Sequence, residues 1–403
     1  MTSCSRKLAA VVAIQIAVAS CGEKAPDAAL PVTGPPAAPS AALGAGVTEV
    51  TVFNDPYVDQ VNWEDYTIHN RIISLVRNTP AGQYIRAAIH SITVPAVTDA
   101  LLDAHNSGVN VYVVHSGHDN GTQGQRLAAA LGDRYTKCRG SASDVEGCIS
   151  NRSSSLMHSK FFTFSQTVDG GVSKPYVVAV TSANMTHAQA RLYNNLVIIG
   201  GDQTTYDGYK NVFTDMRYLR KNNNYLVDDP DGSFSSSAAA LKSYFSPRAD
   251  SNGGTSEQAS TDVVANTLGY LSGGSGCYVK AAQNMFTSGR DPIADELIRI
   301  RKLGCTVQLA YTNMDSGIKA RLKDGGVQLR LVDSPAKIHH KYYVVYGTYA
   351  GTSGAYRLFT GSHNWSGSAL RINDEVLLKL YDRTVINAFL GNFGTIWSRG
   401  VAQ

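Results

Sequence analysis

The sequence predicts an α/β protein made of two similar lobes, each with a mixed, mostly parallel β-sheet flanked by helices. Three observations lead to this prediction: short β-branched or aromatic runs alternate with amphipathic helical segments, the connections are short, and the same order of segments occurs twice. The chain has 403 residues, of which 43% are hydrophobic and 17% charged, so it can bury the cores of two lobes.

The first 46 residues are expected to precede the lobes. A basic pair, an apolar run at residues 8–19 and small residues before Cys21 are typical of a signal segment, residues 1–21. The sequence Val-Ala-Ser-Cys that ends at Cys21 resembles a bacterial lipobox, which implies a lipidated Cys21 and a membrane anchor. An ordinary signal peptide cut nearby is the alternative. Both predict a secreted or cell-envelope protein. Residues 22–46, rich in Ala and Pro, predict a tether.

The first lobe is expected at residues 47–220. Its segments are a strand at 48–56, a helix at 70–80, a strand at 83–93, a helix and strand at 95–117, and a strand at 156–164. The second lobe, expected at residues 240–403 after a polar linker at 221–239, has the same plan. Its segments lie at 241–248, 262–274, 276–287, 291–313 and 337–346. Gly108 and Gly304 stand between a helix and a strand in each lobe, as C-cap glycines would.

The length of this repeat, roughly 190 residues, is too great for a solenoid. It therefore predicts two lobes that pack against each other, with an active site at the interface that they share. Because both half-sites lie in one chain, we expect a monomer.

Four cysteines follow the two near the N-terminus: Cys138, Cys148, Cys277 and Cys305. An even number in an oxidising compartment predicts two disulfides. Three pairings are possible, and we favour Cys138–Cys148, which are close in sequence, together with Cys277–Cys305. A four-cysteine zinc site would need closely spaced Cys-x-x-Cys pairs, which the sequence lacks.

The net charge gives little indication of a partner. The formal charge of the chain is +4, and two of its basic residues belong to the signal segment. The chain without its signal segment is nearly neutral, which does not indicate a groove that binds nucleic acid. A local patch of basic residues could still exist on such a protein.

A His-x-Lys pair enters a strand in each lobe. The first lobe contains His158 and Lys160, and the second contains His339 and Lys341. Because side chains alternate along a strand, each histidine shares a face with its lysine, while His340 points the other way. His339 is therefore the better candidate for a functional histidine.

Each lobe then repeats a Ser-x-Asn element and a further polar residue. The matching positions are Ser182, Asn184 and Asn195 in the first lobe, and Ser362, Asn364 and Glu375 in the second. The last member follows its asparagine by eleven residues in both lobes. One such residue alone is more often structural, but the recurrence of the whole set indicates a site.

This pattern resembles the phospholipase D superfamily, whose halves each carry His-x-Lys-x4-Asp followed by a Ser-x-Asn element. The resemblance extends from about Thr48 to the C-terminus. The motif aspartates are absent and are replaced by Ser165 and Tyr346. Tyrosyl-DNA phosphodiesterases also lack them and carry an amide in the first half and a glutamate in the second, as Asn195 and Glu375 do here.

The resemblance implies a role for each residue. His158 is the nucleophile and forms a covalent phosphohistidine, while His339 is the general acid and base. Glu375 is expected to orient His158, and Asn195 is expected to orient His339 and to bind substrate. The remaining polar groups would form a cage of donors for the non-bridging phosphate oxygens: Lys160, Lys341, Asn184, Asn364, Ser182 and Ser362.

No metal and no cofactor are expected, because no cluster of carboxylates is spaced to hold Mg²⁺ or Ca²⁺ and the two lysines can supply the positive charge. Of the other histidines, His115 and His118 are read as loop residues and His90 as a packed strand residue.

The sequence thus predicts an exported, metal-independent phosphodiesterase that hydrolyses or transfers a phosphodiester. A phospholipid suits a membrane-tethered enzyme, and we favour it slightly over a nucleic acid. A catalytically silent phosphate-binding module is the alternative from a different class.

Overall fold

The computed structural model describes residues 48–236 and 240–403, which all belong to one unit of the chain. The expected signal segment, the lipidation site Cys21 and the expected tether lie outside the described residues. Within the described ranges, no helix combines the length and the apolar character needed to cross a bilayer.

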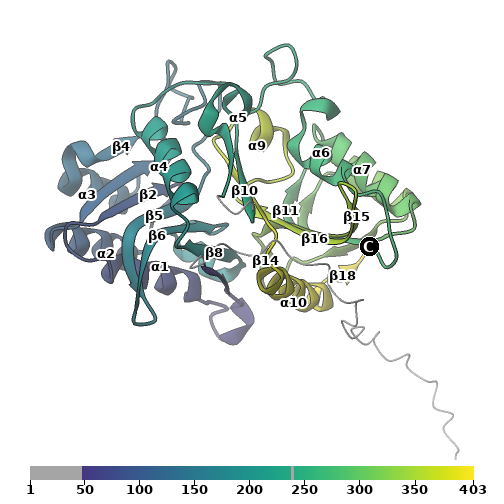
Figure 1. Cartoon of the computed structure of the whole chain (residues 1–403), viewed down its shortest axis with the longest axis horizontal. Helices are drawn as coiled ribbons and strands as arrows, with labels where there is room; N and C mark the ends of the chain where they lie inside the picture. Colours follow the sequence, from purple (N-terminus) through teal and green to yellow (C-terminus); the bar gives the residue numbers. More distant parts are fainter. Residues whose placement is uncertain (1–47, 237–239) are drawn as a thin grey trace, which may run out of the picture. The chain divides into compact units, whose positions relative to one another are not determined.

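The first lobe is built on a seven-stranded sheet (Figure 1). From edge to edge its strands are β4 (Tyr135–Lys137), β3 (Asn110–His115), β2 (Tyr84–Ile89), β5 (Phe161–Asp169), β6 (Val172–Thr181), β8 (Asn195–Gly200) and β1 (Thr48–Phe53).

The second lobe is built on a nine-stranded sheet. Its strands are β18 (Val401–Ala402), β13 (Gln328–Leu331), β12 (Thr306–Met314), β11 (Tyr278–Phe286), β15 (Lys341–Tyr349), β16 (Thr352–Gly361), β17 (Val376–Leu380), β10 (Leu241–Phe245) and β9 (Ser233–Ser235). From β13 to β10 the order matches the first sheet strand for strand, so the predicted pair of similar α/β lobes is confirmed.

The sheets are less parallel than expected. In each lobe only three neighbouring strands pair in parallel, β2–β3–β4 and β11–β12–β13. The ladders from β2 to β1 and from β11 to β10 are antiparallel. The helical crossovers correctly indicated the parallel part. The hairpin of β5 and β6 was missed, although its turn has two glycines, Gly170 and Gly171, with positive φ, which two-residue hairpin turns favour.

Helices cover both sheets. Their bounds are α1 (Thr67–Arg77), α2 (Pro95–Asn106), α3 (Thr122–Leu131), α4 (Gln203–Arg217), α5 (Tyr225–Asp228), α6 (Val263–Gly269), α7 (Asp291–Lys302), α8 (Ser316–Asp324), α9 (Gly367–Arg371) and α10 (Arg383–Arg399). Gly108 and Gly304 follow α2 and α7 with φ of +89° and +87°. This left-handed conformation ends a helix at little cost in glycine, as the sequence predicts.

The hydrophobic core has three parts. One lies between α1–α3 and the first sheet, and another between α6–α8 and the second sheet. The third contains side chains of both lobes, among them Phe161 and Tyr209 from the first and Tyr342 and Phe389 from the second. Burial of apolar surface is the main favourable contribution to folding, so this shared cluster stabilises the contact between the two lobes.

The segment expected as a linker is part of the fold. Within residues 221–239, of which 237–239 are not described, Tyr225 is buried and β9 adds a strand to the second sheet. A second connection between the lobes is the short parallel pair of β14 (Lys337–Ile338) and β7 (Leu192–Tyr193). This pair leads directly into the segment that carries His339.

Both expected disulfides are confirmed. Cys138 pairs with Cys148 and Cys277 pairs with Cys305. The first closes a loop beside the parallel strands of the first lobe, and the second joins the start of β11 to the start of β12.

Candidate active site

His158 ends the loop that leads into β5, and a residue of the other lobe holds its ring. Nδ1 lies 2.8 Å from both carboxylate oxygens of Glu375, which immediately precedes β17. A carboxylate only accepts here, so Nδ1 carries the proton and Nε2 keeps the lone pair that a nucleophile needs. The structure thus places Glu375 on His158 as the sequence predicts.

His339 occupies the corresponding place between β14 and β15. Its Nδ1 lies 3.0 Å from Oδ1 of Asn194, and its backbone N–H donates to the carbonyl of Tyr193 at 2.9 Å. The amide nitrogen of Asn194 donates to two backbone carbonyls of its own lobe, so Oδ1 faces the ring. The expectation that Asn195 orients His339 is therefore wrong, because its neighbour Asn194 does so.

The error has its origin in a one-residue difference in spacing. In each lobe a serine hydroxyl accepts a strand N–H at 3.0 Å: that of Asn195 at Ser182, and that of Val376 at Ser362. The preceding residues, Asn194 and Glu375, are therefore equivalent. The segment before Glu375 is one residue longer and forms α9, where the first lobe has only a 3-10 turn (His187–Arg191).

Ser182 and Ser362 were expected to contact the substrate, and the structure contradicts this. Both are fully buried. Ser182 Oγ donates to Oδ1 of Asn194 at 2.9 Å, and Ser362 Oγ donates to the carboxylate of Glu375. Each hydroxyl also accepts the strand N–H described above, and its only O–H donor is already used within the protein. The serines hold the residues that orient the two histidines.

Asn195, likewise expected to bind substrate, lies in the contact between the lobes. Its Nδ2 donates to Nδ1 of His340 at 2.9 Å, and its Oδ1 accepts from the hydroxyl of Thr360 at 3.0 Å. Asn195 and His340 are both fully buried. As strand alternation predicts, His340 packs on the opposite face from His339, with Phe53 edge-on to its ring.

Lys160 and Lys341 stand on the same face as their histidines. Lys160 Nζ donates to the carbonyl of His158 at 2.5 Å, and Lys341 Nζ donates to that of His339 at 2.7 Å. Burial lowers the pKa of Lys160 to about 7 and lowers the pKa of Lys341 well below its usual value. A phosphate between them would favour the charged ammonium forms.

The two half-sites lie within electrostatic reach of each other. Burial lowers the pKa of His158 and of His339 well below the usual value, and the charges of Lys160 and Lys341 act on both rings. Burial raises the pKa of Glu375, while the charge of Lys160 lowers it. Burial and the two lysines thus favour the neutral form of the His158 imidazole.

Asn184 and Asn364 keep their amide groups unused. Their Oδ1 atoms are buried without a partner, and neither amide nitrogen makes a hydrogen bond to residues 48–236 or 240–403. Both side chains are half-buried. Their amide nitrogens are therefore free to donate, and the expected binding of non-bridging phosphate oxygens by these groups stays a prediction.

Asp374 is a residue of the site that sequence reasoning missed. Its carboxylate accepts the backbone N–H groups of Cys148, Ile149 and Ser150 at 2.6, 3.0 and 2.7 Å. Its carbonyl accepts the backbone N–H of His158 at 2.9 Å. Burial raises the pKa of Asp374 to about 6 in spite of these bonds. The only signal in the sequence is that Asp374 precedes Glu375.

The residues at the places of the missing aspartates have structural contacts. Ser165 Oγ donates to the side chain of Gln83 at 2.8 Å and accepts from the backbone N–H of Tyr84. The ring of Tyr346 packs at 4.2 Å from that of Tyr356 in the neighbouring strand. These contacts lie within the sheets, away from His158 and His339. The replacement of the two motif aspartates therefore affects packing in the sheets and does not alter the lysines and asparagines that would bind a phosphate.

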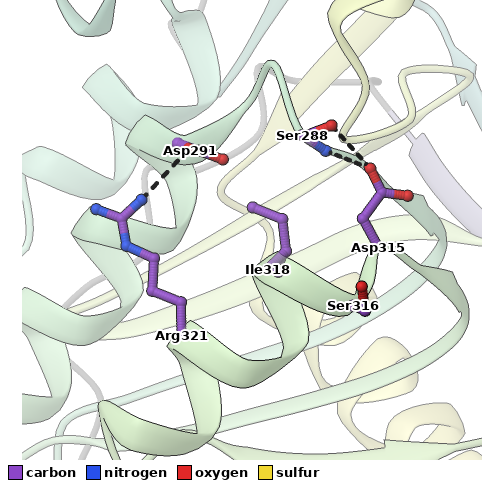
Figure 2. A pocket seen from close by; sticks show the side chains of 7 residues that line it. Ser288, Asp291, Asp315, Ser316, Ile318 and Arg321 are labelled. Carbon is purple, nitrogen blue, oxygen red and sulfur yellow. Dashed lines mark hydrogen bonds and ion pairs between the residues drawn. The ribbon is translucent and has the colours of Figure 1, made fainter.

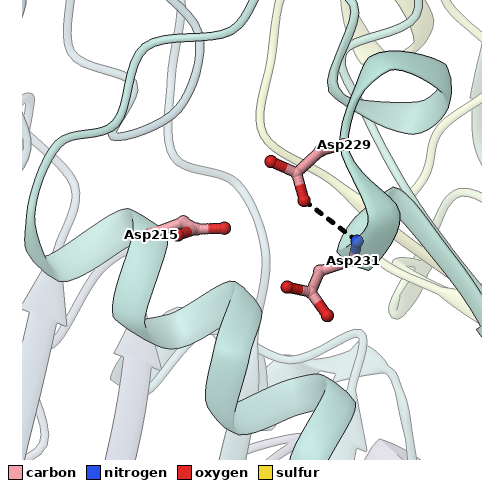
Figure 3. Close-up of side chains that lie close together, drawn as sticks. All are labelled: Asp215, Asp229 and Asp231. Carbon is pink, nitrogen blue, oxygen red and sulfur yellow. Dashed lines mark hydrogen bonds between the residues drawn. The ribbon is translucent and has the colours of Figure 1, made fainter.

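Two other polar features lie apart from these residues. Figure 2 shows a surface pocket between α7 and α8 in which Asp315 accepts from Ser288 and Arg321 pairs with Asp291. Figure 3 shows the one group of three acidic side chains in the described ranges whose oxygens lie close together, Asp215, Asp229 and Asp231. Neither includes a residue of the candidate site.

Comparisons with known proteins agree with this geometry. The family model described as "Cardiolipin synthase, PLD-like domain" matches residues 75–217 and 278–397, which is more than half of the chain and includes both half-sites.

Two curated relatives are mitochondrial cardiolipin hydrolases. That of Chlamydomonas reinhardtii is 25% identical over 117 residues, which cover 28% of this chain and 49% of that protein. That of Xenopus tropicalis is 34% identical over 76 residues, which cover 19% of this chain and 32% of that protein. The chain therefore matches half or less of the length of each.

Among solved structures, phosphatidylserine synthase of Haemophilus influenzae Rd KW20 has a similar fold. The TM-score is 0.59 at 12% sequence identity, and the match covers 90% of this chain and 88% of that one.

Proposed function

Because the chain belongs to the phospholipase D-like family, we propose that it is a phosphodiesterase that works through a covalent phosphohistidine on His158. One observation carries the proposal. Each lobe presents a histidine whose Nδ1 is bound by a residue of the other lobe, which leaves both Nε2 atoms for a substrate.

In the first step, the lone pair of His158 Nε2 attacks phosphorus and forms an N–P bond. The negative charge of a bound phosphodiester favours the protonated form of His339. The bond from phosphorus to the leaving oxygen breaks, and the protonated His339 gives this oxygen its proton. Glu375 stabilises the positive charge that develops on the ring of His158, because its carboxylate accepts from Nδ1.

In the second step, His339 takes a proton from water, whose oxygen attacks phosphorus. The N–P bond breaks and its electron pair returns to His158. An alcohol in place of water gives transfer in place of hydrolysis. The neutral amide of Asn194 leaves the protonated His339 readier to release its proton than a carboxylate would, which suits an acid.

Throughout both steps the donors of Lys160, Lys341, Asn184 and Asn364 face the charge that collects on the non-bridging oxygens. Fixed donors in a buried site stabilise such charge strongly. Since the lysines can supply this charge, we propose that the reaction needs no metal ion.

We favour a phospholipid as the substrate and the cell envelope as the location. The nearly neutral charge of the chain argues against extended tracking of a nucleic-acid backbone, which needs basic residues. The lipobox-like sequence at Cys21 would tether the protein to a membrane. The relatives named for cardiolipin hydrolysis are consistent with a lipid substrate.

The experiment uses the chain from residue 22 onward, with EDTA present. It is given cardiolipin or phosphatidylcholine vesicles, bis(p-nitrophenyl) phosphate, or single-stranded DNA. Turnover of lipid is expected, and turnover of DNA alone would replace the lipid by a nucleic acid. Binding of phosphate without any turnover would identify a silent binding module. His158→Ala is expected to abolish activity, and His105→Ala, on α2, is the matched control.

Turnover quenched with SDS at alkaline pH should trap a phosphohistidine, because the N–P bond is stable in alkali and labile in acid. Trapping that is lost in His339→Ala but retained in His158→Ala would reverse the two roles. Loss of activity on chelation, with recovery on adding back a metal ion, would contradict the metal-independent chemistry.

A further inference from the structure

A cavity of the first lobe lies beside the edge strand β4 and outside the candidate active site. Its volume is about 820 Å³, which is within the usual range for a ligand pocket. Its walls are β4 with the residues that follow it, the loop that the Cys138–Cys148 disulfide closes, and the end of α4. None of the candidate site residues lines it. The reaction described above therefore does not use this cavity.

Three cationic side chains line the cavity: Lys137, Arg139 and Arg217. In the described part of the chain, none of the three pairs with a carboxylate. Lys137 donates to the side-chain carbonyl of Asn120, and Arg217 donates to the backbone carbonyl of Asp133 at 3.3 Å. These acceptors are neutral, so the three positive charges are not compensated by the groups that they contact.

The charge of the lining suits a phosphate group. Glu146 is the one carboxylate among the lining residues, so the lining has a formal charge of +2 (3 − 1). A phosphate monoester carries a charge of about −1.5 to −2 at neutral pH. Part of the wall consists of the small residues 140–143, Gly-Ser-Ala-Ser, which leave room for such a group.

Arg217 is held in place without a ligand. The central carbon of its guanidinium lies 4.6 Å from the ring centroid of Tyr112 and 5.3 Å from that of Tyr218. The attraction between a cation and these rings orients the side chain and leaves N–H groups of the guanidinium to donate. A planar donor that is already oriented loses less conformational entropy when it binds a phosphate.

The second lobe forms the same strands without these cations. The residue after each motif lysine fixes how β2 matches β11. From this match, the parallel ladders make Lys137 of β4 equivalent to Leu331 of β13. Arg139, two residues further along, corresponds to Asp333. One cation is thus replaced by an apolar residue and another by an acid.

The third cation also lacks a counterpart. Helices α4 and α10 follow the equivalent strands β8 and β17, and each begins after a capping aspartate, Asp202 in α4 and Asp382 in α10. Fifteen residues after these caps stand Arg217 and Trp397. The lobe therefore folds without a cation at any of the three places, which indicates that the cations of the first lobe serve a ligand.

The cavity is a neighbour of the candidate active site. Lys137 pairs with His115 in β3, and His115 pairs with Ile89 in β2. β2 in turn pairs with β5, which begins directly after Lys160. Three strand spacings of about 4.8 Å, or roughly 14 Å, thus separate the backbones of the two lysines. Burial lowers the pKa of His118, and the charges of Lys160 and Lys137 both lower it further.

We propose that the cavity at β4 binds a phosphate group, separate from the phosphorus that reacts at His158, through Lys137, Arg139 and Arg217. The phosphate belongs either to a second lipid or to a phosphorylated molecule in solution, since both offer the same chemistry. The inference goes beyond the proposed phosphodiesterase function and does not depend on it.

Calorimetric titration of the chain from residue 22 onward with pyrophosphate tests the cavity directly. Lys137→Gln/Arg217→Gln is expected to weaken the binding of one pyrophosphate by about 100-fold, since each hydrogen bond to a charged group contributes about tenfold. Lys302→Gln/Lys323→Gln, on exposed side chains of α7 and α8, makes the same change in charge and is expected to keep wild-type binding. Both double variants should cleave bis(p-nitrophenyl) phosphate at the wild-type rate.

Sedimentation with phosphatidylcholine vesicles identifies the source of the phosphate. The vesicles are used with and without phosphatidate, which carries a phosphate monoester and offers no phosphodiester to cleave. Binding to phosphatidate vesicles that is lost in Lys137→Gln/Arg217→Gln supports the proposal and assigns the phosphate to a second lipid. Equal vesicle binding by this variant and the wild type, with the expected loss of pyrophosphate binding, supports the proposal and assigns a phosphorylated molecule in solution.

Equal pyrophosphate binding by the wild type and Lys137→Gln/Arg217→Gln would overturn the proposal. Arg139→Gln gives a separate answer if that variant does not fold, because the side chain of Arg139 is exposed. It is expected to weaken pyrophosphate binding by about tenfold, and wild-type binding by this variant would overturn the proposal as well. A wild type that binds pyrophosphate at the cavity and cleaves no phosphodiester would refute the proposed function alone.

Discussion

At the scale of single residues, Asn194 and Glu375 make two similar half-sites chemically different. Both hold the Nδ1 of a histidine from the opposite lobe, and both are held by a buried serine. One is a neutral amide and the other a carboxylate. The difference supports the proposal that His158 attacks phosphorus and His339 transfers the proton.

Asn194→Ala is expected to lower kcat by about 100-fold, the lower range of what a positioned acid–base group contributes. The reason is that His339 loses the acceptor that fixes its proton on Nδ1 and its ring orientation. Steady-state kinetics on bis(p-nitrophenyl) phosphate measures the effect. Asn195→Ala is the neighbouring control. An equal fall in kcat for both variants would contradict the assignment to Asn194.

The lysines predict a proton uptake on binding. The pKa of Lys160 is lowered to about 7 by burial, and that of Lys341 is lowered well below its usual value by burial and by the charge of Lys160. At pH 8 a bound phosphate analogue such as vanadate should raise both, with a net uptake of about one proton or more. Calorimetry in two buffers of different ionisation enthalpy measures it. Buffer-independent enthalpies would contradict the lowered lysine pKa values.

The same groups affect stability with a defined sign. In the unfolded chain Lys160 titrates near 10.5, so between about pH 7 and 10.5 the unfolded state binds more protons than the folded one. The free energy of unfolding should rise with pH over this range, by up to about 1.4 kcal/mol per unit for each such lysine, and this contribution is lost as the pH falls through 7. Lys160→Met should flatten the profile measured by urea unfolding.

The sequence predicts most of the site at this scale because the motif repeats. The prediction that Asn195 orients His339 was wrong because it assumed the same spacing in both lobes. The sequence alone does not reveal that the segment with α9 is one residue longer before Glu375. The equivalence of Asn194 and Glu375 is defined by the hydrogen bonds of the strands that follow them. These bonds depend on how the strands pair in the folded protein, which the sequence does not show. Asp374 was missed for a similar reason, because its partners are backbone amides more than two hundred residues away.

At the scale of elements, the loop closed by Cys138 and Cys148 supports the nucleophile. The backbone N–H groups of three successive residues, beginning at Cys148, donate to the carboxylate of Asp374. The backbone carbonyl of Asp374 in turn accepts the backbone N–H of His158. The other disulfide, Cys277–Cys305, joins two strand starts and has no such link.

This difference predicts that Cys138→Ser/Cys148→Ser lowers kcat, because the amides that hold Asp374 become mobile. Cys277→Ser/Cys305→Ser is the matched control. It is expected to lower the free energy of unfolding by about 2–4 kcal/mol, as a lost native disulfide does, with a smaller effect on kcat. Urea unfolding and kinetics on the same samples separate the two quantities. A larger loss of kcat in the control pair would refute the link from loop to site.

The elements were predicted where local patterns determine them. The helix ends at Gly108 and Gly304 and the parallel strands around them follow from spacing and turn chemistry. The antiparallel ladders were not predicted, because strand runs alone do not tell which neighbour a strand pairs with. The ordered segment at Tyr225 was read as linker since its polar composition conceals a short helix.

At the scale of the whole molecule, the lobes are joined by buried polar contacts as well as by apolar packing. Asn195 of the first lobe binds both His340 and Thr360 of the second. Its counterpart in the second lobe is Val376, an apolar residue. The polar group thus serves the interface between the lobes.

Asn195→Val is expected to lower the free energy of unfolding by about 2–4 kcal/mol, because His340 and Thr360 are left buried without their partner. Urea unfolding measures it. Adding Thr360→Val should recover part of the loss, since replacing both partners by apolar groups is less costly than removing one. A single variant as stable as the wild type would show that the contact does not join the lobes.

The cross-lobe grip on both histidines has a consequence for a chain that is still being made. A polypeptide of which only the first lobe has been made contains His158 but lacks the Glu375 carboxylate that accepts from its ring. It also lacks His339. Glu375 arrives near the end of synthesis. On the proposed mechanism, a chain whose synthesis stops before Glu375 is therefore expected to have no phosphodiesterase activity.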